Sequence, residues 1–257
     1  MIKTPAERFD LSGRVVVVTG GSRGIGRAMV DGLAAAGADV VIASRKAGNC
    51  AQVAAAVEAA TGRRALPVEC HVGRWEDCDR LVQVVYDAFG RCDVLVNNAG
   101  MSPLYPDLLS VTEDYYEKVH SVNARGPFRL AALFGTRMYE ADGGSIINVT
   151  TAGTLRPTAG ELPYVMAKAG LNALTLALAG TWNPKVRANL LIPGAFDTDI
   201  TTAWDPGVKS WAAETNPMRR IGQPEDMVGA CIFLASDASS YINGAQILVD
   251  GGAYRSL

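Results

Sequence analysis

The sequence predicts an α/β protein in which a doubly wound parallel sheet of seven strands lies between two layers of helices, a three-layer sandwich. Short apolar runs rich in β-branched residues alternate along the chain with Ala-rich stretches of helical character. This alternation is typical of parallel α/β sheets. The first run, RVVVVT at residues 14–19, shows no polar alternation, as expected of a strand buried on both faces.

The expected elements follow from these patterns in chain order. Strands are expected at residues 14–19, 39–43, 65–68, 93–96, 145–150, 186–192 and 246–249. Helices are expected at residues 27–36, 49–60, 76–89, 113–140, 164–181 and 224–234. Gly37 and Gly90 follow two of these helices, at the position that favours glycine after a helix C-terminus. A kink is expected in the longest helix at Gly126 and Pro127.

Length and composition predict a single domain over residues 1–257. The chain is 49% hydrophobic and carries a net charge of −2, which excludes a disordered protein. A length of about 250 residues is common for one α/β domain. The segment 197–223 has the weakest pattern and contains Trp204 and Trp211, and we expect it to form a lid over the substrate.

Charge and cysteine content exclude several classes of protein. The chain has 24 Lys and Arg against 26 Asp and Glu, so nothing attracts it to nucleic acid overall. We find no apolar run of the roughly 18 residues that a membrane span requires and no secretory signal, and therefore expect a soluble cytoplasmic protein. Five cysteines without a CxxC pair and only two histidines predict buried reduced thiols and no metal site.

The turn after the first expected strand has the chemistry of a phosphate-binding site. Its glycines follow the spacing Gly20-x-x-x-Gly24-x-Gly26 rather than the common G-x-G-x-x-G. Glycines let the backbone approach a pyrophosphate, and the helix that follows offers it unpaired N–H groups. The candidate cofactor-binding residues of this turn are Gly20, Ser22, Arg23, Gly24, Ile25 and Gly26.

The end of the second expected strand indicates which dinucleotide binds. An NAD site places a carboxylate there to hold the ribose 2′-hydroxyl, but this strand ends in Ser44, Arg45 and Lys46. Arginine and lysine suit a 2′-phosphate, and Arg23 is near enough in the chain to reach the same phosphate. NADP(H) is therefore preferred. Since basic residues are common after strands, NAD(H) stays open.

Tyr164 and Lys168 open the late Ala-rich helix and form the candidate chemical centre. Their spacing of four residues puts both side chains on one face of that helix. A phenol with its ordinary pKa near 10 is a poor acid–base group at neutral pH, whereas a nearby ammonium group favours the phenolate. Taken alone, this pair of residues is a common coincidence.

Six motifs occur together and in order. They are the turn at 19–26, the Asn-Asn-Ala-Gly run at 97–100, Asn123, Tyr164 with Lys168, Pro193 and Gly194 with Thr198, and the Asp-Gly-Gly run at 250–252. With them the chain resembles the short-chain dehydrogenase/reductase family over about residues 9–253. The resemblance is to the single-domain branch that includes ketoacyl carrier-protein reductases and sugar dehydrogenases, and it implies a Rossmann-type fold.

The resemblance also implies a mechanism and an assembly. Tyr164 would be the general acid–base group, Lys168 would bind the nicotinamide ribose and lower the tyrosine pKa, and Asn123 would hold a water that links Lys168 to solvent. Its long helices would pair between subunits of a homotetramer. The residues that would line the cofactor are Asn97, Ala99, Gly100, Tyr164, Lys168, Pro193, Gly194, Phe196 and Thr198.

Two positions depart from the family pattern. The family has a serine about thirteen residues before the tyrosine, and Thr151 stands there; its hydroxyl can still donate to a substrate oxygen, but its β-branch restricts the side chain. His71 and Val72 replace the family's aspartate near the adenine. A histidine can bond to or stack on a purine, and it is equally well explained as a solvated loop residue.

The sequence therefore predicts an oxidoreductase that transfers a hydride between NADP(H) and a carbonyl or secondary alcohol. The alternative from a different class is an NADP(H)-binding sensor with little catalysis, which the missing serine favours. An epimerase of the extended branch is disfavoured by the glycine spacing. Residues expected on the substrate side are Met101, Ser102, Pro103, Leu155 and Arg156, and they do not name the substrate, which we expect to be a small molecule.

Overall fold

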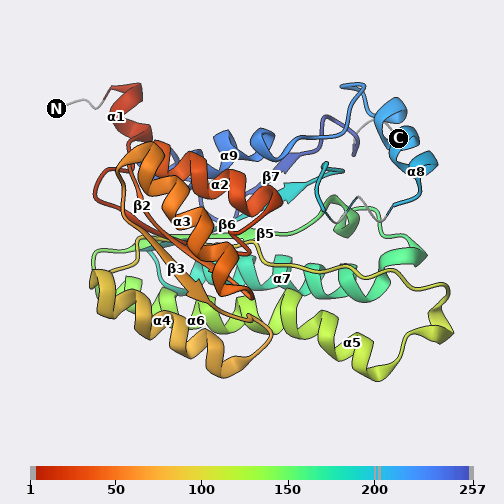
Figure 1. Ribbon diagram of the computed structural model, residues 1–257, viewed down its shortest axis with the longest axis horizontal. Coiled ribbons are helices and arrows are strands. Elements are labelled where there is room, and N and C mark those ends of the chain that lie inside the picture. Colours follow the sequence, from red (N-terminus) through yellow and green to blue (C-terminus); the bar gives the residue numbers. More distant parts are fainter. Residues whose placement is uncertain (1–3, 200, 202–203, 255–257) are drawn as a thin grey trace.

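The computed structural model describes residues 4–199, 201 and 204–254, and its centre is a seven-stranded sheet in the order β3-β2-β1-β4-β5-β6-β7 (Figure 1). All six pairs of neighbouring strands are parallel, which confirms the predicted doubly wound, Rossmann-like α/β fold. The strands are β1 Val15–Thr19, β2 Asp39–Ser44, β3 Ala65–Glu69, β4 Val94–Asn97, β5 Gly144–Val149, β6 Val186–Pro193 and β7 Gln246–Val249.

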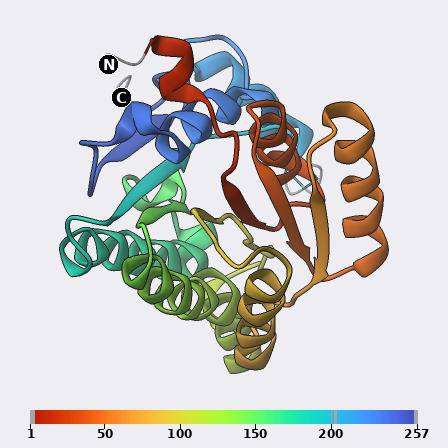
Figure 2. The same ribbon diagram turned by 90° about the vertical axis from the view of Figure 1, so that its left-hand side faces the viewer.

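Helices cover both faces of this sheet (Figure 2). One apolar core lies between the sheet and α2, α3 and α9, and the other between the sheet and α4, α6 and α7. The central strands β1 and β4 are buried on both faces, since every one of their residues is buried, as the absence of polar alternation in the first run predicted. The helices are α1 Pro5–Phe9, α2 Gly24–Ala35, α3 Ala47–Thr61, α4 Trp75–Phe89, α5 Glu113–His120, α6 Gly126–Glu140, α7 Leu162–Thr181, α8 Pro206–Thr215 and α9 Val228–Ala235.

The longest predicted helix is interrupted, although not where the kink was expected. A π-helical turn, Ser121–Arg125, lies between α5 and α6, so the change in helix geometry precedes Gly126 and Pro127. Pro127 is instead the second residue of α6, directly after the π-helical turn. The interruption follows from one extra residue in the turn, which is typical of π-bulges near functional sites.

Two helices, α1 and α8, were not predicted from the sequence, and both have a proline in their first turn. In α1, Thr4 and Glu7 form a capping box in front of Pro5. In α8, Asp205 caps the backbone N–H of Gly207 and Pro206 is the first helical residue. The segment 197–223, which has the weakest sequence pattern and is the predicted lid, therefore contains a helix, while residues 200, 202 and 203 of that segment lie outside the described residues.

The cysteines and the most apolar helix can be compared with expectation. All five cysteines are buried free thiols that form no disulfide, as predicted. One stretch, Ala159–Thr181, is long and apolar enough to cross a membrane by length and composition, which the search for an uninterrupted apolar run overlooked. It contains α7, which packs against β6 and α5, and a layer helix of a globular protein meets the same compositional test.

The junction between the ends of β1 and β4 packs tightly around two glycines. A methyl group on Gly26, near the start of α2, would lie 2.3 Å from the carbonyl oxygen of Gly20 and 2.4 Å from Nδ2 of Asn98. These distances are too short for any real contact, so the turn must move if Gly26 gains a side chain. On α3, by contrast, a methyl group on Gly48 meets nothing within 4 Å.

We predict that Gly26→Ala lowers the free energy of unfolding by about 1–3 kcal/mol, because it forces the two strand ends apart. Gly48→Ala is the matched control and should be neutral or stabilise by up to about 1 kcal/mol through helix propensity. Urea unfolding of both variants measures the difference. A Gly26→Ala protein as stable as the parent would contradict the close packing of this turn.

Candidate active site

The predicted site residues gather at the carboxyl edge of the sheet, where β1 lies between β2 and β4. The chain leaves β1 for α2 on one side and returns in β4 on the other, so loops diverge here and leave space for a ligand, as at the switch point of other doubly wound sheets. Thr19 closes the junction: its Oγ1 accepts the backbone N–H groups of Asn98 and Ala99, each at 3.0 Å. Nδ2 of Asn98 donates to the Thr19 carbonyl at 2.9 Å. Asn98 was not among the predicted site residues, and its contacts place it as the residue that holds the two loops together.

The glycine-rich turn has the backbone shape that its glycines allow. Gly20 and Gly24 have φ values of +68° and +52°, in the left-handed region that disfavours other residues. Gly24 opens α2, so the first N–H groups of that helix lie at the turn. The Thr198 side chain faces Gly24, since a methyl group there would lie 3.5 Å from the Thr198 Cγ2. The predicted phosphate turn and the start of the predicted lid are therefore neighbours.

Basic and hydroxyl side chains gather beside the end of β2. Oγ of Ser22 donates to Oγ of Ser44 at 2.9 Å, which joins the glycine-rich turn to the end of β2, and Arg45 and Lys46 follow at once with exposed side chains. Arg23, predicted to reach the same phosphate, instead forms an ion pair with Asp199 at 3.1 Å. This pair links the turn to the segment after Thr198, which sequence spacing did not indicate.

His71 lies close to this basic group. Burial lowers the pKa of His71, and the positive charges of Arg45 and Arg74 lower it further. Its Nδ1 accepts the backbone N–H of Gly73 at 3.1 Å, and the backbone N–H of His71 donates to the Asp77 carboxylate. His71 is thus held by its loop as a predominantly neutral ring. Val72, the other residue predicted at the adenine, is 6% exposed and therefore offers little more than its backbone.

Some residues predicted to line the cofactor turn their side chains into the core. Nδ2 of Asn97 donates to Oδ1 of Asn148 at 2.9 Å, and Asn148 donates in turn to Thr175. The Asn97 side chain therefore ties β4 to β5 and α7 beneath the site. Pro193 and Phe196 are buried as well, and Phe196 pairs with Gly222 through an isolated bridge.

The three predicted reacting groups converge. Thr151, in the turn after β5, lies close enough to the Tyr164 hydroxyl, near the start of α7, to lower the pKa of that phenol as a hydrogen-bonding neighbour. Nζ of Lys168, one turn further along α7, lies 5.9 Å from the centre of the Tyr164 ring and donates to the Val149 carbonyl at 2.8 Å. Only Tyr164 and Lys168 share a helix, whereas Thr151 comes from the turn after β5.

Asn123 and Gly100 complete this cluster. A methyl group on Gly100 would lie 3.1 Å from Oδ1 of Asn123 and 3.6 Å from Nζ of Lys168, so the glycine lets both polar atoms approach the loop after β4. The π-helical turn carries Asn123, whose Nδ2 donates to the carbonyls of Met101 and Val119. Its Oδ1 accepts the backbone N–H of Met101 at 3.2 Å, so Asn123 is held by three hydrogen bonds, two of them to Met101.

Burial controls the protonation of the cluster. It raises the pKa of Tyr164 above its ordinary value; the charge of Glu161 raises that pKa further, while the hydrogen bond from Thr151 lowers it. Burial lowers the pKa of Lys168 to about 7. The net shift at the tyrosine is thus opposite to the one expected from Lys168 alone, because desolvation of the phenolate outweighs the other influences.

The donor groups at this edge fit a dinucleotide. Positive-φ glycines and the start of α2 can receive a pyrophosphate, and the hydroxyls of Ser22 and Ser44 with Arg45 can receive a ribose phosphate. Lys168 and Asn123 both approach Gly100 in the loop after β4, and Tyr164 lies beside Lys168.

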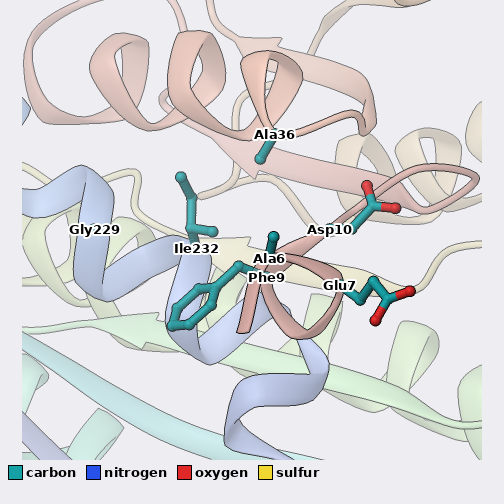
Figure 3. Close-up of a pocket in the computed structure, with 7 residues that line it drawn as sticks. All are labelled: Ala6, Glu7, Phe9, Asp10, Ala36, Gly229 and Ile232. Carbon is teal, nitrogen blue, oxygen red and sulfur yellow. The ribbon is translucent and has the colours of Figure 1, made fainter. Parts of the chain in front are cut away.

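Two hollows lie away from these residues. One, of about 660 Å³, is lined by Ala6, Glu7, Phe9, Asp10, Ala36, Gly229 and Ile232 (Figure 3). Ala36 follows α2, whereas the glycine-rich turn precedes it, so this hollow lies about 18 Å away along that helix, at the opposite edge of the sheet. The other, of about 430 Å³, lies beside α8 and includes Asp197 and Lys209, which form an ion pair at 2.7 Å.

Comparison with known proteins agrees with this architecture. A family model described as enoyl-(acyl carrier protein) reductase matches residues 20–254. The short-chain dehydrogenase/reductase astE of Aspergillus oryzae is 37% identical over 252 residues, which are 96% of this chain and 97% of that protein. The human dehydrogenase/reductase SDR family member 4 is 35% identical over 95% of this chain and 89% of its own.

Among solved structures, a gluconate 5-dehydrogenase from Burkholderia cenocepacia in complex with NADP and tartrate superposes with a TM-score of 0.92. It is 32% identical and covers 97% of this chain and 98% of its own. The ordered motifs, the parallel sheet and these similarities lead to one conclusion. The chain belongs to the short-chain dehydrogenase/reductase family of oxidoreductases.

Proposed function

We propose that this protein reduces a carbonyl compound, or oxidises the corresponding secondary alcohol, with NADP(H). The observation that carries the proposal is the convergence of Tyr164, Thr151 and Lys168 beside the loops that fit a dinucleotide. A phenol and an aliphatic hydroxyl that lie close together can both donate to one carbonyl oxygen, which is what acid catalysis of carbonyl reduction requires.

In the reductive direction, the Tyr164 hydroxyl donates its proton to the carbonyl oxygen while the Thr151 hydroxyl donates a hydrogen bond to the same atom. The raised pKa of Tyr164 keeps the phenol protonated near neutral pH, so it is ready to act as the acid. Lys168 and Asn123 lie behind it and can return a proton to the phenolate through a water. The dinucleotide, when bound, supplies the hydride that reaches the carbonyl carbon.

NADP(H) is proposed as the preferred cofactor because of the groups beside the end of β2. Arg45 and Lys46 are exposed there, and the Ser22–Ser44 hydrogen bond places two hydroxyls next to them. No carboxylate stands in this stretch to receive a ribose 2′-hydroxyl. The related Burkholderia enzyme was crystallised with NADP, which supports the proposal.

A homotetramer, a cytoplasmic location and a single domain with a lid at 197–223 belong to the same proposal. Large apolar side chains are exposed along α6 and α7, where the family's subunits pair: Phe128, Tyr139, Met166 and Leu176. Trp211 in α8 is 62% exposed, which suits a lid helix that closes over a small-molecule substrate. Arg156 stacks on Tyr254 at the border of the proposed substrate side.

Thr151→Ala should lower kcat/KM for ketone reduction on the order of 10²-fold, because it removes a hydrogen bond to the developing oxyanion. Thr151→Ser should keep or raise the parent rate, and Thr136→Ala, an exposed threonine of α6 that bonds to its own helix, should leave it unchanged. NADPH oxidation over a panel of ketones, aldehydes and acyl-thioester ketones measures all three. Full activity in Thr151→Ala would refute its role, and cofactor binding without turnover across the panel would favour a sensor protein.

Arg45→Asp should reverse the cofactor preference. The carboxylate repels a 2′-phosphate and accepts a 2′-hydroxyl, so kcat/KM for NADPH should fall about 10- to 100-fold while that for NADH rises. Arg8→Asp, in α1, is the matched control and should not alter the ratio. If the parent and Arg45→Asp had equal kcat/KM values with each cofactor, Arg45 would not bind the 2′-phosphate.

A further inference from the structure

Glu161 lies beside the turn that carries Thr151 and near Tyr164. It ends the short 3₁₀ helix Ala159–Glu161 and precedes α7, three residues before Tyr164. A methyl group on Gly153 would lie 3.0 and 3.1 Å from its two carboxylate oxygens, and Gly153 follows Thr151 by two residues. The carboxylate therefore sits between the Thr151 turn and the start of the Tyr164 helix, close enough for its charge to raise the tyrosine pKa.

The structure does not balance this carboxylate with a positive charge. Its Oε1 accepts a hydrogen bond from Oγ1 of Thr158 at 3.2 Å. Over residues 4–199, 201 and 204–254 no Lys, Arg or His forms an ion pair with it. Burial raises the pKa of Glu161, which shows that the carboxylate has lost part of its hydration without gaining a cation in return.

Helix capping does not account for the position of this side chain. An acidic residue in front of a helix commonly accepts a hydrogen bond from an N–H of the first turn, but the Glu161 side chain makes no such bond to α7. The backbone around it is held from the other side. The Tyr105 hydroxyl donates to the Ala159 carbonyl and accepts the N–H of Leu162, so the segment is fixed to the loop that follows β4.

We infer that Glu161 selects the substrate by charge, and that the site takes a ketone or secondary alcohol bearing a protonated amine near the reacting carbon. This inference rests on the proposed function and adds the substrate class to it. An ammonium group on the substrate supplies the positive charge that the described part of the chain does not. Glu161 repels a substrate that carries a carboxylate at the same point, and it neither attracts nor repels a neutral substrate.

The test uses three ketones of one shape and different charge. They are 1-methyl-4-piperidone, protonated at pH 6.5; 4-methylcyclohexanone, neutral; and 4-oxocyclohexanecarboxylate, negative. The parent should show the highest kcat/KM for the amine and the lowest for the carboxylate. Glu161→Gln, which keeps the shape and removes the charge, should lower kcat/KM for the amine about 10-fold, raise it several-fold for the carboxylate, and change it less than about 3-fold for the neutral ketone.

A second readout separates a charge effect from a loss of structure. The titratable groups that face Tyr164 are Glu161 and Lys168. Removing the negative charge of Glu161 lowers the pKa of Tyr164, so the rise of alcohol oxidation with pH should move to lower pH in Glu161→Gln. Glu225→Gln, at the start of the 3₁₀ helix Pro224–Met227, is the matched control and should change neither the charge preference nor the pH profile.

Three outcomes overturn the inference. If Glu161→Gln changes kcat/KM for all three ketones by the same factor, Glu161 has a structural role. If it changes kcat/KM for none of them, Glu161 has no role in selection. In both cases the proposed function stands, because the neutral ketone is still reduced. If the parent reduces members of the wider carbonyl panel but not the amine, the substrate class fails and the proposed function stands; if it consumes neither NADPH nor NADH with the three ketones or with any member of that panel, both fail.

Discussion

Three hydrogen bonds between the ends of β1 and β4 hold the rest of the site in place. Thr19 accepts two backbone N–H groups of the loop after β4, and Asn98 returns one bond to the Thr19 carbonyl. With these bonds formed, the glycine-rich turn and the loop of Ala99 and Gly100 are held side by side at the carboxyl edge of the sheet. The space between Gly20 and Gly26 leaves no room for a side chain, so the two loops cannot pack in this way if Gly26 gains one. The proposed path of the dinucleotide follows these loops from Arg45 to Lys168 and Asn123.

The cluster of Tyr164 and Lys168 is both buried and polar, and this combination accounts for its proposed chemistry. Lys168 is 2% exposed, and its ammonium form is stabilised mainly by the carbonyl of Val149. A lysine in such a position titrates near neutral pH and can therefore give or take a proton there. The pKa of Tyr164 is raised, so the phenol keeps its proton. The two groups are thus suited to pass a proton from solvent to a carbonyl oxygen.

The sequence predicted the layers well because they depend on local signals. Buried strands read as apolar runs, and a four-residue spacing predicted that Tyr164 and Lys168 share one helix, as they do in α7. Thr151 was proposed from the family resemblance, by its distance from the tyrosine, and its role stays a prediction. The orientation of Asn97 was beyond reach, because its partner Asn148 lies on another strand 51 positions away. The Arg23–Asp199 pair spans 176 positions, and no local pattern predicts such a contact. The π-helical turn at Asn123 and the position of Glu161 likewise depend on how α7 packs against the loop after β4.

The central claim is that the Tyr164 hydroxyl is the acid that completes carbonyl reduction, and Tyr164→Phe tests it most directly. The measurement is the rate of NADPH consumption with a ketone that the parent reduces, together with the NADPH dissociation constant from cofactor fluorescence. The account predicts a loss in kcat on the order of 10²-fold or more with the dissociation constant within about 3-fold of the parent value. A Tyr164→Phe protein that turns over like the parent would contradict it.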